Sequence, residues 1–229
     1  MSGSGAQVQL PLAVALRDSA TFGSFYAAGN EAVVHALRAA DEAFVYFWGV
    51  HGAGKSHLLQ AVCHHAVDRR VSAGYLPQGE RANLRPAALD GFERQQVVCL
   101  DDLHAVAGLP EWETALFNLF NGLRERGGRL VVAAEAAPAA LKMGLPDLSS
   151  RLASGAVFRL AELDDAGKVA ALQHRARRRG FEMPDAVAEY LLSRCPRDTY
   201  SLFALLERLD HASLAAQRRL TIPFVRTLL

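Results

Sequence analysis

The spacing of hydrophobic residues divides the chain into two parts. The first part has both strand-like and helix-like patterns, and the second has helix-like patterns only. Before about residue 163, short apolar runs typical of buried strands alternate with segments whose apolar residues recur at helical spacing. We expect strands at residues 43–48, 73–76, 97–100, 129–134 and 156–160, and helices at 31–40, 56–70 and 112–126. Only helical spacing follows, which predicts helices at about 164–179, 185–194, 198–215 and 221–228.

This order of elements predicts the fold class and the domains. Strands that alternate with helices favour a parallel sheet inside a three-layer α/β sandwich. Residues 1–20 begin with a Gly/Ser-rich stretch and show no sustained period, which is typical of a flexible arm. We therefore expect an N-terminal arm at 1–20, an α/β base at 21–163 and a small all-helical lid at 164–229.

The composition is that of an ordinary globular protein and excludes several classes. The 229 residues are 51% hydrophobic and 21% charged, and the formal net charge of +1 argues against a surface that binds nucleic acid everywhere. Cys63, Cys99 and Cys195 lack the spacing of a disulfide framework or a zinc site. No signal peptide and no apolar run of about 18 residues is apparent, so we expect a cytoplasmic protein without membrane contact.

Residues 49–56, Gly-Val-His-Gly-Ala-Gly-Lys-Ser, match every fixed position of the phosphate-binding loop G-x-x-x-x-G-K-[ST]. The loop lies between a predicted strand and a predicted helix, where backbone N–H groups bind phosphate. Lys55 reaches the β- and γ-phosphate oxygens in such loops, and the Ser56 hydroxyl is a ligand for Mg²⁺. We expect a nucleoside di- or triphosphate to contact Gly49, Gly52, Ala53, Gly54, Lys55, Ser56 and His57.

A pair of aspartates follows the third predicted strand. Asp101 and Asp102 come directly after the apolar run 97–100, about 45 residues beyond the phosphate loop. The carboxyl ends of parallel strands are where α/β sheets place their chemistry. We expect Asp101 to hold Mg²⁺, directly or through water, and Asp102 to activate water. The alternative is a helix cap or turn at the strand end.

The combination of motifs resembles the AAA+ superfamily. The phosphate loop, the acidic strand end, the helical lid and the sequence Leu-Ser-Ser-Arg-Leu at residues 148–152 occur in the AAA+ order. In AAA+ assemblies, an arginine before the last base strand reaches the γ-phosphate of the neighbouring subunit. The resemblance therefore implies that Arg151 is a trans arginine finger. The alternatives are a structural salt bridge and a solvated arginine.

The start of the base is similar to the replication initiators of the DnaA family. Thr-Phe-Gly-Ser-Phe at residues 21–25, followed by Gly29-Asn30, resembles the initiator segment that flanks the adenine. This resemblance covers residues 20–229 and implies that Phe25 and Asn30 contact ADP or ATP. The initiators continue into a helix-turn-helix domain, whereas no dedicated DNA-binding domain is apparent after residue 215. The chain thus resembles the short DnaA homologues that inactivate the initiator.

The N-terminal arm contains the sequence Gln-Val-Gln-Leu-Pro-Leu at residues 7–12. It resembles the Gln-x-x-Leu-x-Leu peptide with which such proteins bind the replication sliding clamp. The resemblance implies that the Gln7 amide contacts the rim of the clamp pocket while Leu10 and Leu12 fill its apolar groove. The alternative is an ordinary tail.

Two positions depart from the AAA+ pattern. The fourth base strand ends in Ala-Ala-Glu at residues 133–135, where the initiators have a polar sensor, so only Glu135 could take that role. In the lid, Tyr200 aligns with an arginine that contacts the nucleotide phosphates, and Arg197 lies about one turn earlier. Both departures predict weak intrinsic ATP hydrolysis with nucleotide binding retained. The basic run 175–179 favours a solvated helix face over a DNA contact.

The resemblance implies a negative regulator of replication initiation. It would bind ADP or ATP with Mg²⁺, dock on the DNA-loaded sliding clamp, and insert Arg151 against ATP bound to the initiator DnaA. The initiator would then hydrolyse its ATP. AAA+ proteins usually assemble, so a homo-oligomer is expected. Two enzymes remain as alternatives: a self-sufficient AAA+ ATPase that loads helicases or remodels DNA, and a small-molecule kinase with the same loop.

Overall fold

The computed structural model describes residues 16–229 except 18, 80–83, 197 and 217, and the side chain of Tyr200 is also outside this part. Gln7, Leu10 and Leu12 of the predicted clamp peptide therefore lie outside the described residues, as does Arg197. The chain divides into two compact units. The base unit contains the described parts of residues 1–22, 32–49 and 55–160, and the lid unit contains residues 23–31, 50–54 and 161–229.

The base unit is built on a parallel five-stranded sheet with the strand order β2-β3-β4-β1-β5. The strands are β1 (Phe44–Trp48), β2 (Ala73–Pro77), β3 (Val97–Asp101), β4 (Arg129–Ala134) and β5 (Ala156–Arg159). β2, β3 and β4 are buried throughout, whereas the edge strand β5 alternates between half-buried and exposed positions. The predicted strands and the predicted three-layer α/β fold are confirmed.

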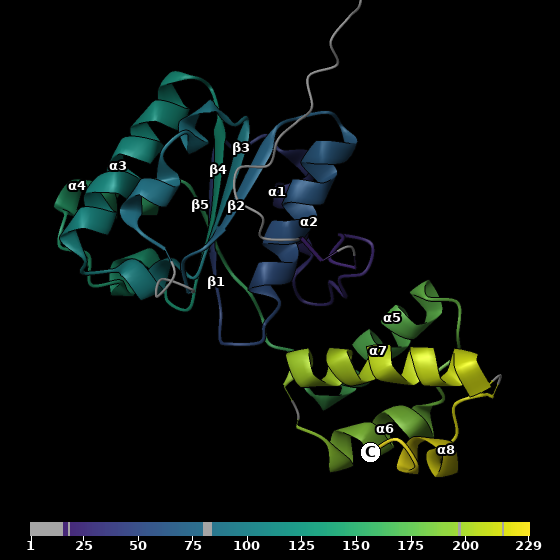
Figure 1. The fold of residues 1–229 in the computed structure, drawn as a ribbon. Helices are drawn as coiled ribbons and strands as arrows, with labels where there is room; N and C mark the ends of the chain where they lie inside the picture. Colours follow the sequence, from purple (N-terminus) through teal and green to yellow (C-terminus); the bar gives the residue numbers. More distant parts are fainter. Residues whose placement is uncertain (1–15, 18, 80–83, 197, 217) are drawn as a thin grey trace, which may run out of the picture. The chain divides into compact units, whose positions relative to one another are not determined.

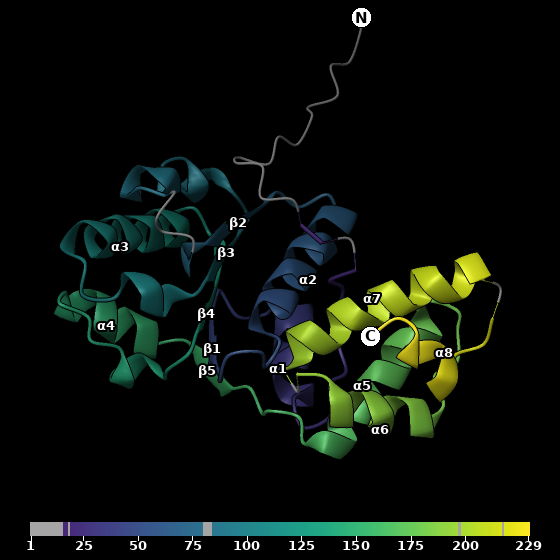
Figure 2. The same ribbon diagram turned by 60° about the horizontal axis from the view of Figure 1, so that its bottom comes forward.

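Helices cover both faces of the sheet. Figures 1 and 2 show α1 (Glu31–Ala39) and α2 (Lys55–Asp68) on one face, and α3 (Pro110–Glu125) and α4 (Pro146–Ala153) on the other. α4 was not expected from the sequence because an eight-residue helix is too short for a clear period. The same reason applies to the short 3-10 helices η2 (Pro86–Leu89), η3 (Phe92–Arg94), η4 (Leu103–Val106) and η5 (Pro138–Ala140).

A buried arginine ties α1 to the start of β4. The guanidinium of Arg129 donates hydrogen bonds of 3.0 Å to the carbonyl oxygens of Ala36, Leu37 and Glu42. Ala36 and Leu37 belong to the last turn of α1, whose carbonyl oxygens have no partner within the helix. Burial lowers the pKa of Arg129. The contact thus satisfies helix-end carbonyls in the interior of the base unit.

The lid unit is helical, as predicted. Its helices are α5 (Asp165–Arg178), α6 (Asp185–Arg194), α7 (Thr199–Ala216) and α8 (Ile222–Arg226). Leucines and small residues form the shared core, among them Leu172, Leu191, Leu206 and Leu209, each at most 1% exposed. Within the described part of the chain, no helix is both long and apolar enough to cross a bilayer.

Two arginines of the basic run 175–179 pack within the lid, whereas Arg177 and Arg178 are exposed. The guanidinium of Arg175 lies 3.8 Å from the centre of the Phe203 ring. Arg179 forms ion pairs with Glu207 at 2.8 Å and with Asp210 at 3.2 Å. Both partners belong to α7, so these arginines fasten α5 to α7. The expectation of a solvated helix face is therefore wrong for Arg175 and Arg179.

Candidate functional site

The phosphate loop connects β1 to α2. Gly52 and Gly54 have φ angles of +79° and +96°, a backbone conformation that favours glycine. The N–H of Gly49 donates to the carbonyl oxygen of Ala134 at 3.2 Å. Lys55 is 5% exposed, and its Nζ donates to the carbonyl oxygen of Gly49 at 3.0 Å. The loop therefore has the geometry of a phosphate cradle.

Asp101 and Ser56 meet beside this loop. The Asp101 carboxylate is 1% exposed, accepts a hydrogen bond from the Tyr75 hydroxyl at 2.8 Å, and accepts another from the N–H of Asp102 at 3.0 Å. The Ser56 side chain also hydrogen-bonds to it. Burial raises the pKa of Asp101, and the bonds from Ser56 and Tyr75 oppose this shift. A helix start and a strand end thus bring together two of the predicted residues.

These two side chains fit a magnesium ion bound together with a nucleotide. Mg²⁺ prefers oxygen ligands and usually takes one or two from the protein, with the rest from phosphates and water. The Ser56 hydroxyl and the Asp101 carboxylate supply such oxygens side by side. Among the residues that the structure describes, no group of three His, Cys, Asp or Glu side chains could hold a metal by itself. The site therefore fits Mg²⁺ with phosphate, rather than a metal held by the protein alone.

Neutralising Asp101 should stabilise the nucleotide-free protein at neutral pH. Because its pKa is raised, the folded protein binds this proton more tightly than the unfolded chain. The protonated Asp101 side chain contributes this stability fully below the ordinary aspartate pKa of about 3.9. The contribution is lost as the pH rises through the raised pKa of the folded protein. Asp101→Asn should therefore have a higher melting temperature than the wild type at pH 7, and the difference should shrink towards pH 4.

Thermal unfolding in EDTA between pH 4 and pH 8 measures this difference. Asp90→Asn serves as the control because Asp90 is exposed on a loop of the same unit. A melting temperature below that of the wild type at pH 7 would mean that the ionised carboxylate contributes net stability, contrary to the expectation.

Asp102 follows β3 and Glu135 follows the neighbouring strand β4. Their carboxylates lie near Gly79 and His104 respectively. Asp102 has a φ of +53°, which aspartate tolerates better than most residues. A Cβ added to Gly79 would lie 2.6 Å from Asp102 Oδ2, so this carboxylate lies against the backbone that follows β2. Glu135 Oε2 lies 3.6 Å from His104 Nε2, and the Glu135 N–H donates to His104 Nδ1 at 3.3 Å. Their catalytic roles stay predictions.

The segment predicted to flank adenine is anchored in the lid unit. A Cβ added to Gly54 would lie 2.8 Å from Phe25 Cε2, so the Phe25 ring packs against the phosphate loop. The side-chain oxygen of Asn30 accepts from the N–H of Ala161 at 2.7 Å, and its amide donates to the Ala161 carbonyl oxygen at 3.1 Å. The Asn30 side chain thus orders this segment, and its direct contact with nucleotide stays a prediction.

Two further hydrogen bonds lie in or next to the phosphate loop. In the base unit, His57 Nε2 lies 2.9 Å from the carbonyl oxygen of Thr21. In the lid unit, the Thr199 hydroxyl donates to the carbonyl oxygen of Gly52. The sequence did not identify Thr199 as a neighbour of the loop, and the alignment with the initiators indicated Tyr200 instead. The capping pattern at Asp198, whose carboxylate accepts from the N–H of Ser201 at 2.7 Å, was the available signal that α7 begins here.

Arg151 lies on α4 against aromatic rings of α3. Its guanidinium is 4.6 Å from the centre of the Phe117 ring and 5.4 Å from that of Phe120. Among the described residues, no carboxylate forms an ion pair with Arg151. The side chain is half-buried. The aromatic faces therefore hold a guanidinium whose charge is not neutralised by a described acidic side chain.

A buried glutamate holds the turn that leads into α4. Glu113 is 2% exposed, and its carboxylate accepts hydrogen bonds from the N–H groups of Gly108 at 2.7 Å, Gly144 at 3.0 Å and Leu145 at 2.7 Å. Leu145 is the residue before α4. Glu113 shares one face of α3 with the two rings beneath Arg151, at spacings of four and seven residues. Its role is not apparent in the sequence, because an acidic residue in a first helical turn is usually solvated.

Two family models match parts of the chain. Residues 165–229 match the Hda lid domain. Residues 45–123 match a model described as RNA helicase, and this match includes the phosphate loop and Asp101.

Solved structures with the same fold cover most of the chain. Domain III of the replication initiation protein DnaA from Thermotoga maritima has a TM-score of 0.73 and 18% identity, over 93% of this chain and 97% of that one. AMPPCP-bound DnaA from Aquifex aeolicus has a TM-score of 0.67 and 20% identity, over 85% and 66%. The RuvB Holliday junction branch migration motor of Thermotoga maritima has a TM-score of 0.61 and 15% identity, over 88% and 66%. The chain therefore has the AAA+ fold of the DnaA type, and its residues 165–229 match the Hda lid domain.

Proposed function

We propose that this protein is a negative regulator of replication initiation that acts on the ATP of the initiator DnaA. It binds adenine nucleotide, with ADP as the expected form, docks on the DNA-loaded sliding clamp, and presents Arg151 to the initiator. The observation that carries the proposal is the Arg151 guanidinium stacked on Phe117 and Phe120 without a described acidic partner.

Nucleotide binding is supported by the geometry of the phosphate loop. The left-handed glycines and the buried Lys55 form an anion site at the start of α2. Ser56 and Asp101 are the residues that would hold Mg²⁺, which when bound neutralises charge on the phosphate oxygens. Phe25 supplies an aromatic surface beside the loop. A DnaA of the same fold has been solved with AMPPCP bound, which supports adenine nucleotide as the ligand.

The arginine finger is supported by how α3 holds α4. An arginine finger stabilises negative charge that develops on the transferring phosphoryl group of a neighbouring active site. It must be charged, preorganised and not neutralised by a carboxylate of its own subunit. Stacking on Phe117 restricts the Arg151 side chain, and Glu113 fixes the turn before its helix. The chemistry then takes place on the partner's nucleotide.

A self-sufficient AAA+ ATPase is the second candidate, and the intact phosphate loop with Asp101 and Asp102 favours it. Two observations support the regulator instead. The Asp102 carboxylate lies against the Gly79 backbone, and Glu135, at the sensor position, faces His104. We therefore infer weak intrinsic hydrolysis. Steady-state ATP turnover by the isolated chain separates the two candidates, because a self-sufficient ATPase turns over without initiator or clamp.

A reconstituted assay tests the proposal. The initiator is loaded with labelled ATP and mixed with clamp on DNA, and conversion to ADP is followed with and without this protein. We expect rapid conversion only when protein, clamp and DNA are all present, and loss of conversion when residues 1–12 are deleted. Conversion that is equally fast without the protein would contradict the regulator function, and conversion that needs no clamp would contradict the docking step.

A further inference from the structure

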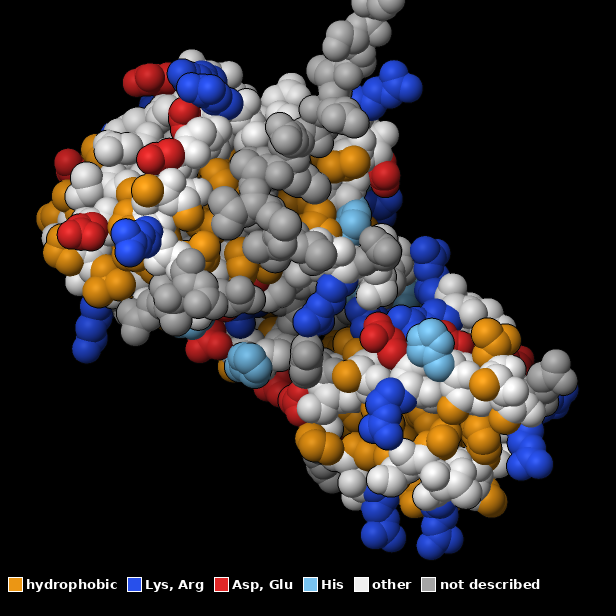
Figure 3. Space-filling view, viewed as in Figure 1, with side chains coloured by type: hydrophobic (Ala, Val, Ile, Leu, Met, Phe, Trp, Pro, Cys, Tyr) orange, Lys and Arg blue, Asp and Glu red, His pale blue; other side chains and the backbone are white. Residues whose placement is uncertain are grey.

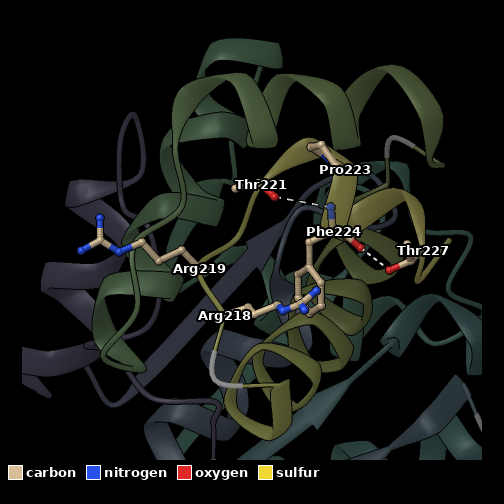
Figure 4. Close-up of a pocket in the computed structure, with 6 residues that line it drawn as sticks. All are labelled: Arg218, Arg219, Thr221, Pro223, Phe224 and Thr227. Atoms are coloured by element: carbon tan, nitrogen blue, oxygen red, sulfur yellow. Dashed lines mark hydrogen bonds between the residues drawn. The ribbon is translucent and has the colours of Figure 1, made fainter.

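The C-terminal end of the lid carries a positively charged pocket. Residues 211–229 contain Arg218, Arg219, Arg226 and His211 but no Asp or Glu, although the whole chain has a net charge of only +1. A cavity of about 460 Å³ opens here beside α8 (Figure 4). Its lining consists of Arg218, Arg219, Thr221, Pro223, Phe224 and Thr227.

The backbone of this pocket is held by local hydrogen bonds. Ser213 fixes Arg218 from both sides: its carbonyl oxygen accepts from the Arg218 N–H at 3.2 Å, and its hydroxyl donates to the Arg218 carbonyl oxygen at 2.6 Å. Thr221 Oγ1 accepts from the N–H of Phe224 at 3.4 Å, and the Thr227 hydroxyl donates to the Phe224 carbonyl oxygen at 2.7 Å. Leu220 and Val225 anchor the segment in the lid core. The arginines therefore extend from an ordered backbone.

The arginines in and beside the pocket have no acidic partner among the described residues. Arg218, Arg219 and Arg226 are exposed, and no ion pair joins them to an acidic side chain in the described part of the chain. By contrast, Arg175 in α5 contacts the Phe203 ring, and Arg179, which follows α5, pairs with two carboxylates of α7. In Figure 3, Lys and Arg side chains project from the surface of the lid. Around α8, exposed arginines therefore occur in a segment, residues 211–229, that contains no acidic side chain.

We propose that this pocket binds the phosphate backbone of duplex DNA without reading its sequence. Arginine guanidinium groups donate hydrogen bonds in pairs and match phosphate oxygens. In Figure 4, Arg218 extends towards the Phe224 ring and Arg219 to the opposite side, so their guanidinium groups are placed for separate phosphates. α8 has only five residues, too short for a recognition helix in the major groove. The contact is therefore electrostatic and positional.

Such a contact gives the protein a second attachment to DNA-loaded partners. Weak sites that act together on one assembly raise its overall affinity without further contacts at either site. The proposal itself needs neither the clamp nor the initiator, so it can be tested on the full chain alone.

Fluorescence anisotropy with a labelled 20-base-pair duplex of arbitrary sequence tests the pocket. We compare the wild type with Arg218→Ala/Arg219→Ala between 50 and 200 mM NaCl. Phosphate contacts by Arg218, Arg219 and the neighbouring exposed Arg226 predict a slope of log affinity against log salt of about −2.7, a loss of about 40-fold across this range. The double variant should show a slope of about −0.9 and a loss of about 3-fold.

Arg177→Ala/Arg194→Ala is the matched control, because it removes the same charge from exposed positions of α5 and α6. It should keep the wild-type slope to within about half a unit. Wild-type binding that does not depend on salt, or an equal loss in the control, would overturn the proposal. So would a pocket variant that binds duplex normally but fails in the reconstituted initiator assay, since the pocket would then bind an acidic protein surface.

Discussion

Replacing Arg151 with alanine should abolish the stimulation of initiator ATP hydrolysis while the protein still folds and binds nucleotide. Arginine fingers contribute about 10³-fold or more to the rate of phosphoryl transfer, because the guanidinium stabilises charge that develops only in the transition state. Arg151 is half-buried and forms no ion pair with a described residue, so its removal leaves no unpaired carboxylate. The stacking on Phe117 that is lost is worth about 1 kcal/mol.

The measurement is the rate of ATP-to-ADP conversion on the initiator in the reconstituted assay. Arg151→Lys keeps the charge but lacks the planar guanidinium, so it should lose most of the stimulation as well. Arg124→Ala removes an exposed arginine of α3 and should leave the rate unchanged. Nucleotide and clamp affinities are measured separately for each variant. Full stimulation by Arg151→Ala would exclude the finger role.

Replacing Lys55 with alanine should weaken nucleotide binding by about 100-fold. Charge-assisted hydrogen bonds to phosphate oxygens contribute up to about 3 kcal/mol, which corresponds to that factor. Lys55 is almost fully buried, and its ammonium group donates a hydrogen bond to the Gly49 carbonyl oxygen. Because an ammonium group is costly to bury, the variant should unfold in the absence of nucleotide at a temperature no lower than that of the wild type.

Isothermal titration with ADP and with ATP, both with Mg²⁺, measures the affinities. Melting temperatures provide a second measurement, since a bound ligand stabilises the folded state and its loss removes the shift. Lys142→Ala removes an exposed lysine of the same unit and should behave as the wild type. An affinity within about 3-fold of the wild type would show that the loop amides alone hold the phosphates.

The described part of the site combines residues that the sequence could identify with residues that it could not. Gly52, Gly54 and Ser56 belong to a local motif, whose backbone conformation depends on a few adjacent residues. Asp101 was recognised because it directly follows a buried apolar run. Glu113 was not recognised, since its three N–H donors come from two other segments of the chain.

The roles of the arginines required the tertiary structure. The sequence marked Arg151 by its place before the last strand, but the rings that hold it lie more than 30 residues earlier on α3. Arg175 and Arg179 appeared solvated in the sequence, whereas α7 supplies their partners. Arg218 and Arg219 remain exposed in the fold. An arginine's sequence context thus does not show whether its charge is available.

The sequence by itself determined the order of the five strands and the longer helices, the helical lid and the phosphate loop. Hydrophobic period and local backbone requirements act between residues that are close along the chain, so they can be recognised without a fold. Only the tertiary structure decided the strand order β2-β3-β4-β1-β5, the attachment of Phe25 to the phosphate loop, and the placement of Arg151 on Phe117. Each of these depends on packing between distant segments, and no local pattern specifies which surfaces meet.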